Sequence, residues 1–264
     1  MQHSKFDQNR YFLKDSIRKT VDFSKTDQNQ GLPPPPIEKP YKNDQKAIPL
    51  IPPSDLADLY AITLQSAISN RQSRRQFNGE SISLTELSFL LWATQGIRQP
   101  IDYGHALRTV PSAGARHALE TYLAVLNIDN LGAGFYRYLP VSHSILEERL
   151  DGLAGQKIKK VSFQQDWMAD AAVVFIWTTI PYRMEWRYGL AAHKVILLDA
   201  GHVCQNLYLA CEAIGAGTCA VAAYDQEQVD QVLGIDGDDE FVIYTAAVGR
   251  PRGHKHQDSC LGLK

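Results

Sequence analysis

Several features that would point to a particular class of partner are missing from the sequence. It has 27 Lys and Arg residues against 29 Asp and Glu residues, so neither sign of charge is in excess. A balanced charge gives no electrostatic reason to expect nucleic acid or an anionic membrane as a partner. No run approaches the roughly 20 apolar residues of a membrane span, and residues 1–16 lack the apolar core of a signal peptide. We therefore expect a cytoplasmic protein whose ligands are small molecules.

Cysteine is also scarce, which bears on metal binding. The four cysteines, Cys204, Cys211, Cys219 and Cys260, form no C-x-x-C pair, so neither a thiolate zinc site nor another metal site is expected. Cys204 and Cys211 lie seven residues apart in a helical pattern, which favours buried core thiols over redox chemistry. The G-x-G-x-x-G, P-loop, H-E-x-x-H and G-x-S-x-G motifs are absent as well.

Composition divides the chain into two parts. Residues 1–57 are rich in Gln, Asn, Asp and Lys and contain four consecutive prolines, Pro33 to Pro36. Such a segment buries little apolar area, so we expect an extended arm with polyproline character that either wraps a neighbour or stays solvated. Residues 58–264 have a globular pattern, and their length fits one domain.

Periodicity and capping signals predict the main elements of this domain. Ser83 and Glu86 match the capping box, which predicts a helix from Leu84 to Gly96. Other helices are expected at about 55–69, 190–214 and 226–233. Runs rich in branched and aromatic residues predict strands at 120–127, 134–139, 171–178, 217–223 and 241–248. The helix over 190–214 has few exposed positions in its pattern, so it should be central, with a subunit interface as one location.

Two arginine groups are candidates for anion binding. In an extended segment Arg71, Ser73 and Arg75 point to one side, where two guanidinium groups and a hydroxyl would suit a phosphate monoester. A solvated helix end is the alternative explanation for these residues. A second group, Arg250 and Arg252, follows the last predicted strand.

Two stretches of small residues are candidates for close approach of a ligand. Pro111–Ala115 precedes the predicted strand at 120–127, and residues 215–223 contain only Gly, Ala, Thr, Cys and Val. Where side chains are this small, a flat molecule has room to lie against the backbone.

These motifs, taken in order, resemble the nitroreductase superfamily of FMN-dependent oxidoreductases. The order is R-x-S-x-R, P-S-A-G-A-R-H-A-L-E-T-Y, D-A-G-H-x-x-Q-N-L-x-L-A, G-A-G-T-C-A and V-G-R-P, from about Asn70 to Arg252. The sequence is similar in particular to the SagB-type branch, which is related to the azoline oxidases of thiazole/oxazole-modified peptides. The resemblance implies an α+β fold with a central mixed, mainly antiparallel sheet flanked by helices, in an intertwined homodimer with FMN at the interface.

The resemblance also assigns roles to residues. Arg71, Gln72, Ser73 and Arg75 would contact the phosphate, ribityl chain and pyrimidine edge of FMN. Pro111, Ser112, Ala113 and Gly114 would line the flavin ring from the other subunit. The segment that offers backbone amides near flavin N5 would be Ala220, Val221, Ala222 and Ala223. Arg250 would be a phosphate cation, with Arg252 as a further candidate.

One departure from the branch concerns the reaction. Peptide azoline oxidases carry a Lys-Tyr pair ahead of a glycine, whereas this sequence has Arg187-Tyr188-Gly189. Tyr188 remains a candidate catalytic acid or base, but an arginine stays protonated near neutral pH and cannot serve as a base. Asp199, His202 and Asn206 share one helical stripe, for which a buried hydrogen-bonded network is the expected role.

The expected function is that of an FMN-dependent oxidoreductase that works by ping-pong hydride transfer. Its substrate would be a small molecule or a peptide heterocycle. Two alternatives stay open: an NAD(P)H-dependent nitro or quinone reductase, and a non-catalytic flavin-binding partner subunit. The flavin performs the redox chemistry in each enzymatic case, while the protein supplies placement and electrostatics.

Overall fold

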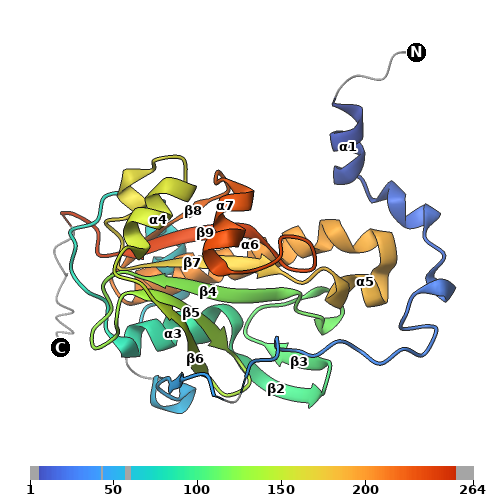
Figure 1. Cartoon of the computed structure of the whole chain (residues 1–264), viewed down its shortest axis with the longest axis horizontal. Helices are drawn as coiled ribbons and strands as arrows, with labels where there is room; N and C mark the ends of the chain where they lie inside the picture. The colour runs from blue at the N-terminus through green and yellow to red at the C-terminus, as the bar shows by residue number, and fades with distance from the viewer. Residues whose placement is uncertain (1–5, 43, 57–60, 254–264) are drawn as a thin grey trace.

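A seven-stranded sheet forms the centre of the molecule. The structure is a computed structural model, and it describes residues 6–42, 44–56 and 61–253. The strand order is β1-β6-β5-β4-β7-β9-β8, and neighbouring strands are antiparallel throughout (Figure 1). Its strands are β1 Ala47–Pro49, β4 Leu119–Val125, β5 Gly134–Leu139, β6 Ser144–Leu150, β7 Val173–Thr179, β8 Gly217–Val221 and β9 Phe241–Gly249. A separate hairpin pairs β2, Ile97–Asp102, with β3, His105–Arg108.

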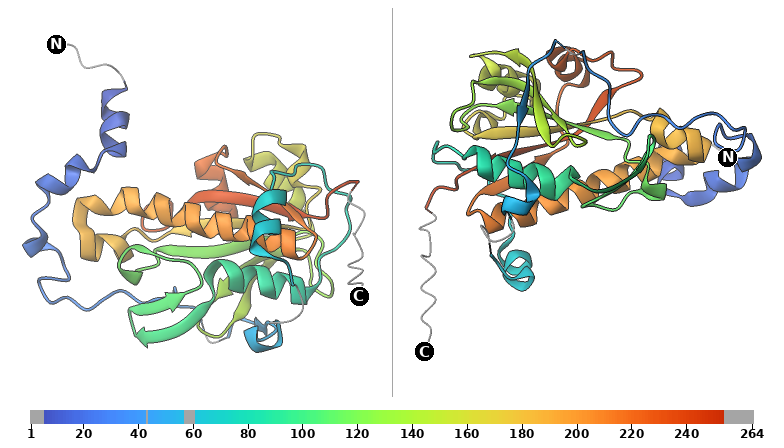
Figure 2. Two further views of the ribbon diagram at one scale, coloured as in Figure 1. Left: turned by 180° about the vertical axis from the view of Figure 1, so that it is seen from behind. Right: turned by 90° about the horizontal axis from the view of Figure 1, so that it is seen from below.

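Helices cover both faces of the sheet. The helices are α1 Asp7–Leu13, α2 Leu64–Asn70, α3 Leu84–Gln95, α4 Ala154–Val161, α5 Tyr182–Tyr188, α6 Ala192–Ala213 and α7 Gln226–Leu233. On one face Leu123, Phe175 and Trp177 share a core with α3 and α6. On the other, Ala124 and Ile176 share a core with α4 and α7 (Figure 2). Because both faces are covered, every residue of β4 and β7 is buried.

Most predicted elements are confirmed with small shifts of their ends. The capping box at Ser83 and Glu86 starts α3 as predicted, and α7 and β5 have the predicted bounds. The α+β class and the mainly antiparallel sheet agree with the resemblance. The described residues also contain two isolated parallel bridges, between Ser73 and Thr218 and between Ile82 and Ile128.

The helix predicted at about 55–69 is confirmed over 64–69 but not at its start. Pro53–Leu56 is a 3-10 turn, residues 57–60 lie outside the described residues, and α2 begins only at Leu64. The reason is local, because the side chain of Thr63 accepts a hydrogen bond from Ser66 N and caps a new helix there. The sequence analysis also missed β6 and the β2–β3 hairpin, whose charged residues and Pro100 conceal the strand pattern.

The predicted extended arm is partly helical and lies on its own chain. Residues 7–25 form α1 and two 3-10 turns, Asp15–Thr20 and Phe23–Lys25. Residues 33–42, here called the strap, then run without helix or strand along the body (Figure 1). Three buried arginines donate to strap carbonyls: Arg108 to Ile37 over 2.6 Å, Arg137 to Lys39 over 2.9 Å and Arg116 to Pro35 over 3.4 Å.

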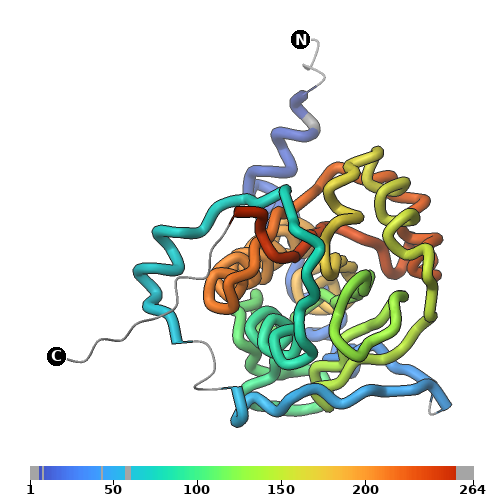
Figure 3. The backbone as a smooth tube through the Cα atoms, turned by 90° about the vertical axis from the view of Figure 1, so that its left-hand side faces the viewer, coloured from blue at the N-terminus to red at the C-terminus, as the bar shows by residue number. Residues whose placement is uncertain are grey.

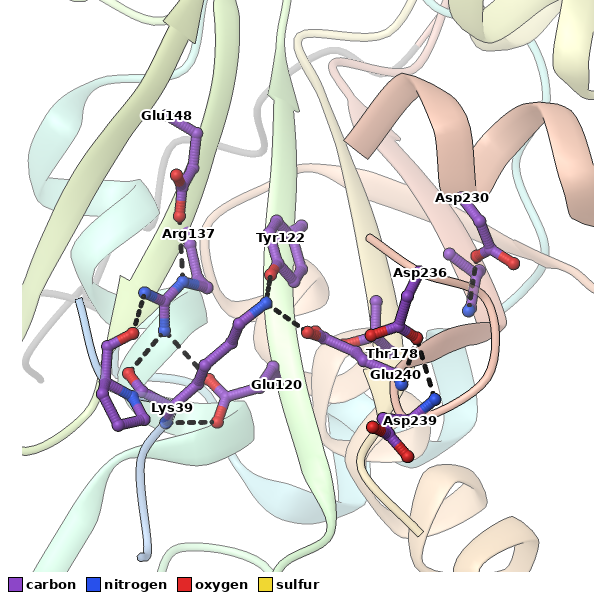
Figure 4. Close-up of polar contacts among 12 residues, drawn as sticks. Lys39, Glu120, Tyr122, Arg137, Glu148, Thr178, Asp230, Asp236, Asp239 and Glu240 are labelled. Atoms are coloured by element: carbon purple, nitrogen blue, oxygen red, sulfur yellow. Dashed lines mark hydrogen bonds and ion pairs between the residues drawn. The ribbon is translucent and has the colours of Figure 1, made fainter. Parts of the chain in front are cut away.

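A buried ion network anchors the same strap. The carboxylate of Glu120 accepts from Lys39 N over 2.8 Å (Figure 4). It also accepts from Arg183 Nη2 over 2.6 Å. Lys39 Nζ forms an ion pair with Glu240, which also accepts a hydrogen bond from Thr178. A polyproline-like segment makes no hydrogen bonds of its own, so its carbonyls are available to these side chains.

Candidate functional site

The segment that carries Arg71, Ser73 and Arg75 lies at the edge of the sheet. It follows α2 and runs beside the edge strand β8, where Ser73 forms a bridge with Thr218. Arg74 N donates to Thr218 O over 3.0 Å. The local sequence explains the path, because α2 ends at Asn70 and Arg71 has left the helical conformation. The extended segment predicted from the sequence therefore adds to the sheet.

Tyr208 on α6 joins three of the predicted site positions. Its hydroxyl lies 3.0 Å from Ser73 Oγ and accepts a hydrogen bond from Ala220 N over 3.0 Å. The guanidinium of Arg71 lies over its ring, 5.4 Å from the centroid. Sequence reasoning missed this residue, which occupies the unspecified position of the L-x-L-A motif. A tyrosine on a helix otherwise expected to carry core residues was the only available signal.

The remaining residues of these two segments differ in exposure. Gln72, Arg75, Ala222 and Ala223 are exposed, whereas Val221 is buried. Neither Arg71 nor Arg75 forms an ion pair with a carboxylate within the residues that the structure describes. Two cations thus flank Ser73 in the sequence, beside the end of β8.

The C-terminal arginines lie beside the same segment but are already engaged. Asn78 N donates to Arg250 O and Arg252 N donates to Gln76 O, each over 2.9 Å, so the two arginine groups lie side by side (Figure 3). The guanidinium of Arg250, however, donates to Glu86 Oε1 and to Ile214 O, each over 2.5 Å. Arg252 Nε donates to Phe77 O over 2.6 Å. In this arrangement both side chains bind protein groups: Arg250 joins the start of α3 to the end of α6, and Arg252 binds the segment before α3.

The small-residue segment Pro111–Gly114 packs against the first half of α6. Ala113 N lies 3.3 and 3.4 Å from the two carboxylate oxygens of Asp199, which is buried. Burial raises the pKa of Asp199, while hydrogen bonds from Ser112 and Ala113 oppose that shift. Asp199, His202 and Asn206 do not form the predicted common network. Asp199 binds this segment, Asn206 donates to Ala93 O, and His202 is exposed.

Gly114 brings Tyr188 and Arg187 to the same place. Its φ is +60°, and a Cβ there would stand 2.7 Å from the Tyr188 hydroxyl and 2.8 Å from Arg187 Nε. The absence of a side chain is therefore what lets these two residues approach the backbone. The guanidinium of Arg187 also lies over the Tyr188 ring, 5.5 Å from its centroid.

We expect Gly114→Ala to displace Tyr188 and Arg187 and to destabilise the fold by about 1–2 kcal/mol, the usual cost of a left-handed alanine. A urea melt measures that loss. Gly152→Ala is the matched control, since a Cβ at Gly152 meets nothing within 4 Å. Equal midpoints for the two variants would contradict this description of Gly114.

Within one chain the two halves of the predicted site stay apart. Asp199, which holds the Pro111–Gly114 half, and Tyr208, which holds the Arg71–Ser73 half, are nine residues apart on α6. At the helical rise this is about 14 Å. The structure thus brings together Arg71, Ser73 and Ala220 at one place and Ser112, Ala113, Gly114 and Tyr188 at another.

The described residues contain neither a cluster of metal ligands nor a helix that could span a membrane. Among the described residues, no group of three or more His, Cys, Asp or Glu side chains is arranged to hold a metal ion. Cys204 and Cys211 are buried free thiols, as predicted; Cys219 is buried as well, and Cys260 lies outside the described residues. No helix in the described part of the chain has both the length and the apolar character of a membrane span.

The antiparallel sheet, the long helix α6 across one face and the arginine segment on the edge strand define an α+β protein with the nitroreductase fold. The chain belongs to the nitroreductase family, whose sequence profile matches residues 68–250. It is 31% identical to the protein MJ1384 of Methanocaldococcus jannaschii over 195 residues, which are 74% of this chain and 94% of that protein. Family membership makes it a nitroreductase-type oxidoreductase.

The narrower resemblance to the SagB-type branch is also confirmed. The chain is 25% identical to the microcin B17-processing protein McbC of Escherichia coli over 149 residues, which are 51% of each protein. Among solved structures, a nitroreductase of Anabaena variabilis superposes with a TM-score of 0.66 at 26% identity, covering 81% of this chain and 43% of that chain.

Proposed function

We propose that the protein is an FMN-dependent oxidoreductase that works as a homodimer. The observation that carries this proposal is the meeting of Arg71, Ser73 and Ala220 around Tyr208 at the edge of the sheet. A phosphate monoester is bound by cations and hydroxyl donors, and this place supplies both. When bound, FMN supplies the two-electron redox chemistry.

The residues at this place fit the cofactor. Arg71, Arg75 and Ser73 would hold the phosphate and ribityl chain, with Gln72 beside them. The end of β8, from Ala220 to Ala223, would offer backbone amides to the ring. Arg250 and Arg252 are bonded to protein groups, so we assign them the support of this segment and a weaker part in binding phosphate.

A homodimer would complete the site. In one chain Pro111–Gly114 packs at Asp199 and the Arg71 segment at Tyr208, about 14 Å apart along α6. In a homodimer a second copy would bring its own Pro111–Gly114 to the first copy's phosphate-binding residues. The surface supports such pairing, because α6 exposes Leu197 and Leu198, and α2 exposes Leu64 and Ile68. Exposed apolar residues on neighbouring helices are typical of an interface.

The substrate would be a small molecule or a peptide heterocycle. Relatedness to McbC, a microcin B17-processing protein, favours a peptide-derived substrate. Tyr188 is the residue we assign to proton transfer, since its hydroxyl lies beside Gly114 and Arg187 stays charged. Reduction of nitro or quinone acceptors by NAD(P)H uses the same site and remains a second candidate, supported by family membership.

A comparison of FMN with riboflavin tests the proposal. Because the two ligands differ only in the phosphate, we expect FMN to bind about a hundredfold or more tightly, the result of two or more charge-assisted hydrogen bonds. Quenching of flavin fluorescence measures both affinities. Equal affinities would place the cofactor away from Arg71 and Arg75 and contradict the proposed site.

A further inference from the structure

The N-terminal arm covers the turn that carries Arg187 and Tyr188. Residues 21–32, here called the cover loop, lie against α5 and the turn that follows it (Figure 2). Gln28 N donates to Trp186 O over 2.9 Å, and Trp186 Nε1 donates to Leu32 O over 3.0 Å. Tyr182 at the start of α5 donates to Asp27 Oδ2 over 2.7 Å. These bonds tie the cover loop to both ends of α5.

The cover loop is itself a folded turn. Leu32 N donates to Asp27 O over 2.9 Å, and Asn29 Nδ2 donates to Phe23 O over 2.6 Å. Thr26 is 6% exposed, and its methyl group stands 3.9 Å from the position of a Cβ on Gly189, with Val21 at 3.6 Å. A loop with its own hydrogen bonds and a buried contact can hold the turn at Gly189 in one conformation.

Trp186 is fixed from the opposite side by the body. The guanidinium of Arg116 lies over its ring, 4.7 Å from the centroid, and Arg116 Nε donates to Arg183 O over 3.0 Å. Arg116 also donates to Gly104 O over 2.7 Å. Trp186 is 4% exposed and is thus clamped between the cover loop and a buried arginine.

Tyr188 lies two residues beyond this clamp. It ends α5, and Gly189, with φ +51°, turns the chain toward α6. On its far side the Tyr188 hydroxyl meets Gly114. Its position is therefore set by Gly114 on one side and by the segment that Trp186 and the cover loop hold on the other.

We propose that the cover loop, acting through Trp186, positions Tyr188 for the reaction. Trp186 is a positioning residue in this account, because it touches the cover loop, Arg116 and its own helix. The inference rests on the proposed function of Tyr188. A displacement of about 1 Å in a reacting group is enough to slow a reaction by about a hundredfold. Because Tyr188 is the last residue of α5, a less firmly held α5 should slow the reaction.

Truncation separates the cover loop from the strap. A chain that begins at Pro33 lacks the cover loop but keeps the carbonyls of Pro35, Ile37 and Lys39 for the buried arginines. A chain that begins at Asp15 lacks only α1 and the residues before it, and is the control. We expect the first truncation alone to speed backbone hydrogen exchange in residues 182–191 by about tenfold or more, while FMN affinity stays within twofold. Unchanged exchange in residues 182–191 would overturn the proposal.

Turnover of NADPH with a quinone acceptor gives a second readout. We expect the chain that begins at Pro33 to have a kcat about tenfold or more below that of the untruncated protein. In the Tyr188→Phe variant, the same truncation should lower kcat by less than about twofold. Trp186→Phe removes the bond to Leu32 O but keeps a ring under Arg116, so it should cause a smaller loss in the same direction. Losses that multiply in the double variant would overturn a role through Tyr188.

Different results would contradict the proposed FMN-dependent function and the positioning role of the cover loop. If the full-length protein binds no FMN, the proposed function fails, while hydrogen exchange in residues 182–191 still shows whether the cover loop holds the turn. If FMN binds and the truncation changes neither exchange nor kcat, the positioning role fails alone.

Discussion

Replacing Glu120 with alanine should lower the free energy of unfolding by about 3–5 kcal/mol, the usual cost of removing one partner from a buried ion pair. Glu120 is 3% exposed and accepts from Arg183 Nη2 over 2.6 Å, and Arg137 Nη1 stands 3.7 Å away. Burial alone would raise the pKa of this carboxyl group, but Arg183 and Arg137 outweigh burial and hold its pKa below the usual value. The side chain is therefore a charged centre that compensates two buried guanidinium groups.

The loss would extend to the strap. Glu120 also accepts from Lys39 N, so its removal leaves a strap donor without its acceptor and takes away the carboxylate that faces both Arg183 and Arg137. Glu148→Ala is the control, because Glu148 meets the same Arg137, over 3.0 Å, with a side chain that is 25% exposed. For that variant we expect a loss of about 1 kcal/mol or less. Thermal and urea melts compare the two, and equal losses would contradict the central role of Glu120.

Replacing Arg71 with alanine should weaken FMN binding by about 10- to 150-fold, the equivalent of 1.5–3 kcal/mol for a lost charge-assisted hydrogen bond. Arg71 is half-buried against Tyr208 rather than free in solvent, so its guanidinium is held in place before any phosphate arrives. A held cation loses little conformational entropy on binding, which favours an effect near the upper end of this range.

Three further variants sharpen that test. Arg71→Lys keeps the charge but not the planar fork, and should recover part of the affinity. Tyr208→Phe removes the hydroxyl that joins Ser73 to Ala220 and should weaken binding without any change of charge. Arg149→Ala, near the end of β6, removes an arginine that is more exposed than Arg71 and that no part of the proposal uses. Equal FMN affinities for Arg71→Ala and Arg149→Ala would count against the site.

Much of the fold was predictable from local patterns. The capping box at Ser83 and the branched runs of β4, β7 and β9 specify their elements within a few residues. The strand β6 was not predictable in this way, because Glu147 and Glu148 lie in it as partners of Lys46, 101 residues away, and of Arg137 on the adjacent strand β5. Charged residues in a strand are explained only by the tertiary contacts that neutralise them.

The site was predictable in its parts but not in its connections. The alternation of Arg71, Ser73 and Arg75 indicated a common direction, and the structure places this segment on the sheet edge beside β8. Tyr208 could not be predicted as the meeting point, since its partners lie 135 and 12 residues away. The ion pair between Arg250 and Glu86 could not be predicted either, because a sequence shows a cation without showing its acceptor.

The arm was the least predictable part. Its composition indicated poor burial and left wrapping and solvation equally open. Four buried side chains of the body, Arg108, Arg116, Arg137 and Trp186, donate to backbone carbonyls between Leu32 and Pro40. Every residue has a backbone carbonyl, so residue types do not show which carbonyls accept hydrogen bonds from the body. The attachment of the arm to the body therefore cannot be predicted from its residue types.

The central claim, that a pair of these chains holds FMN through Arg71 and Ser73, is tested most directly by sedimentation of the full-length protein with excess FMN, followed at the flavin absorbance band. The account predicts one FMN per chain, sedimenting with a particle of two chains. Protein that sediments without flavin absorbance under these conditions would contradict it.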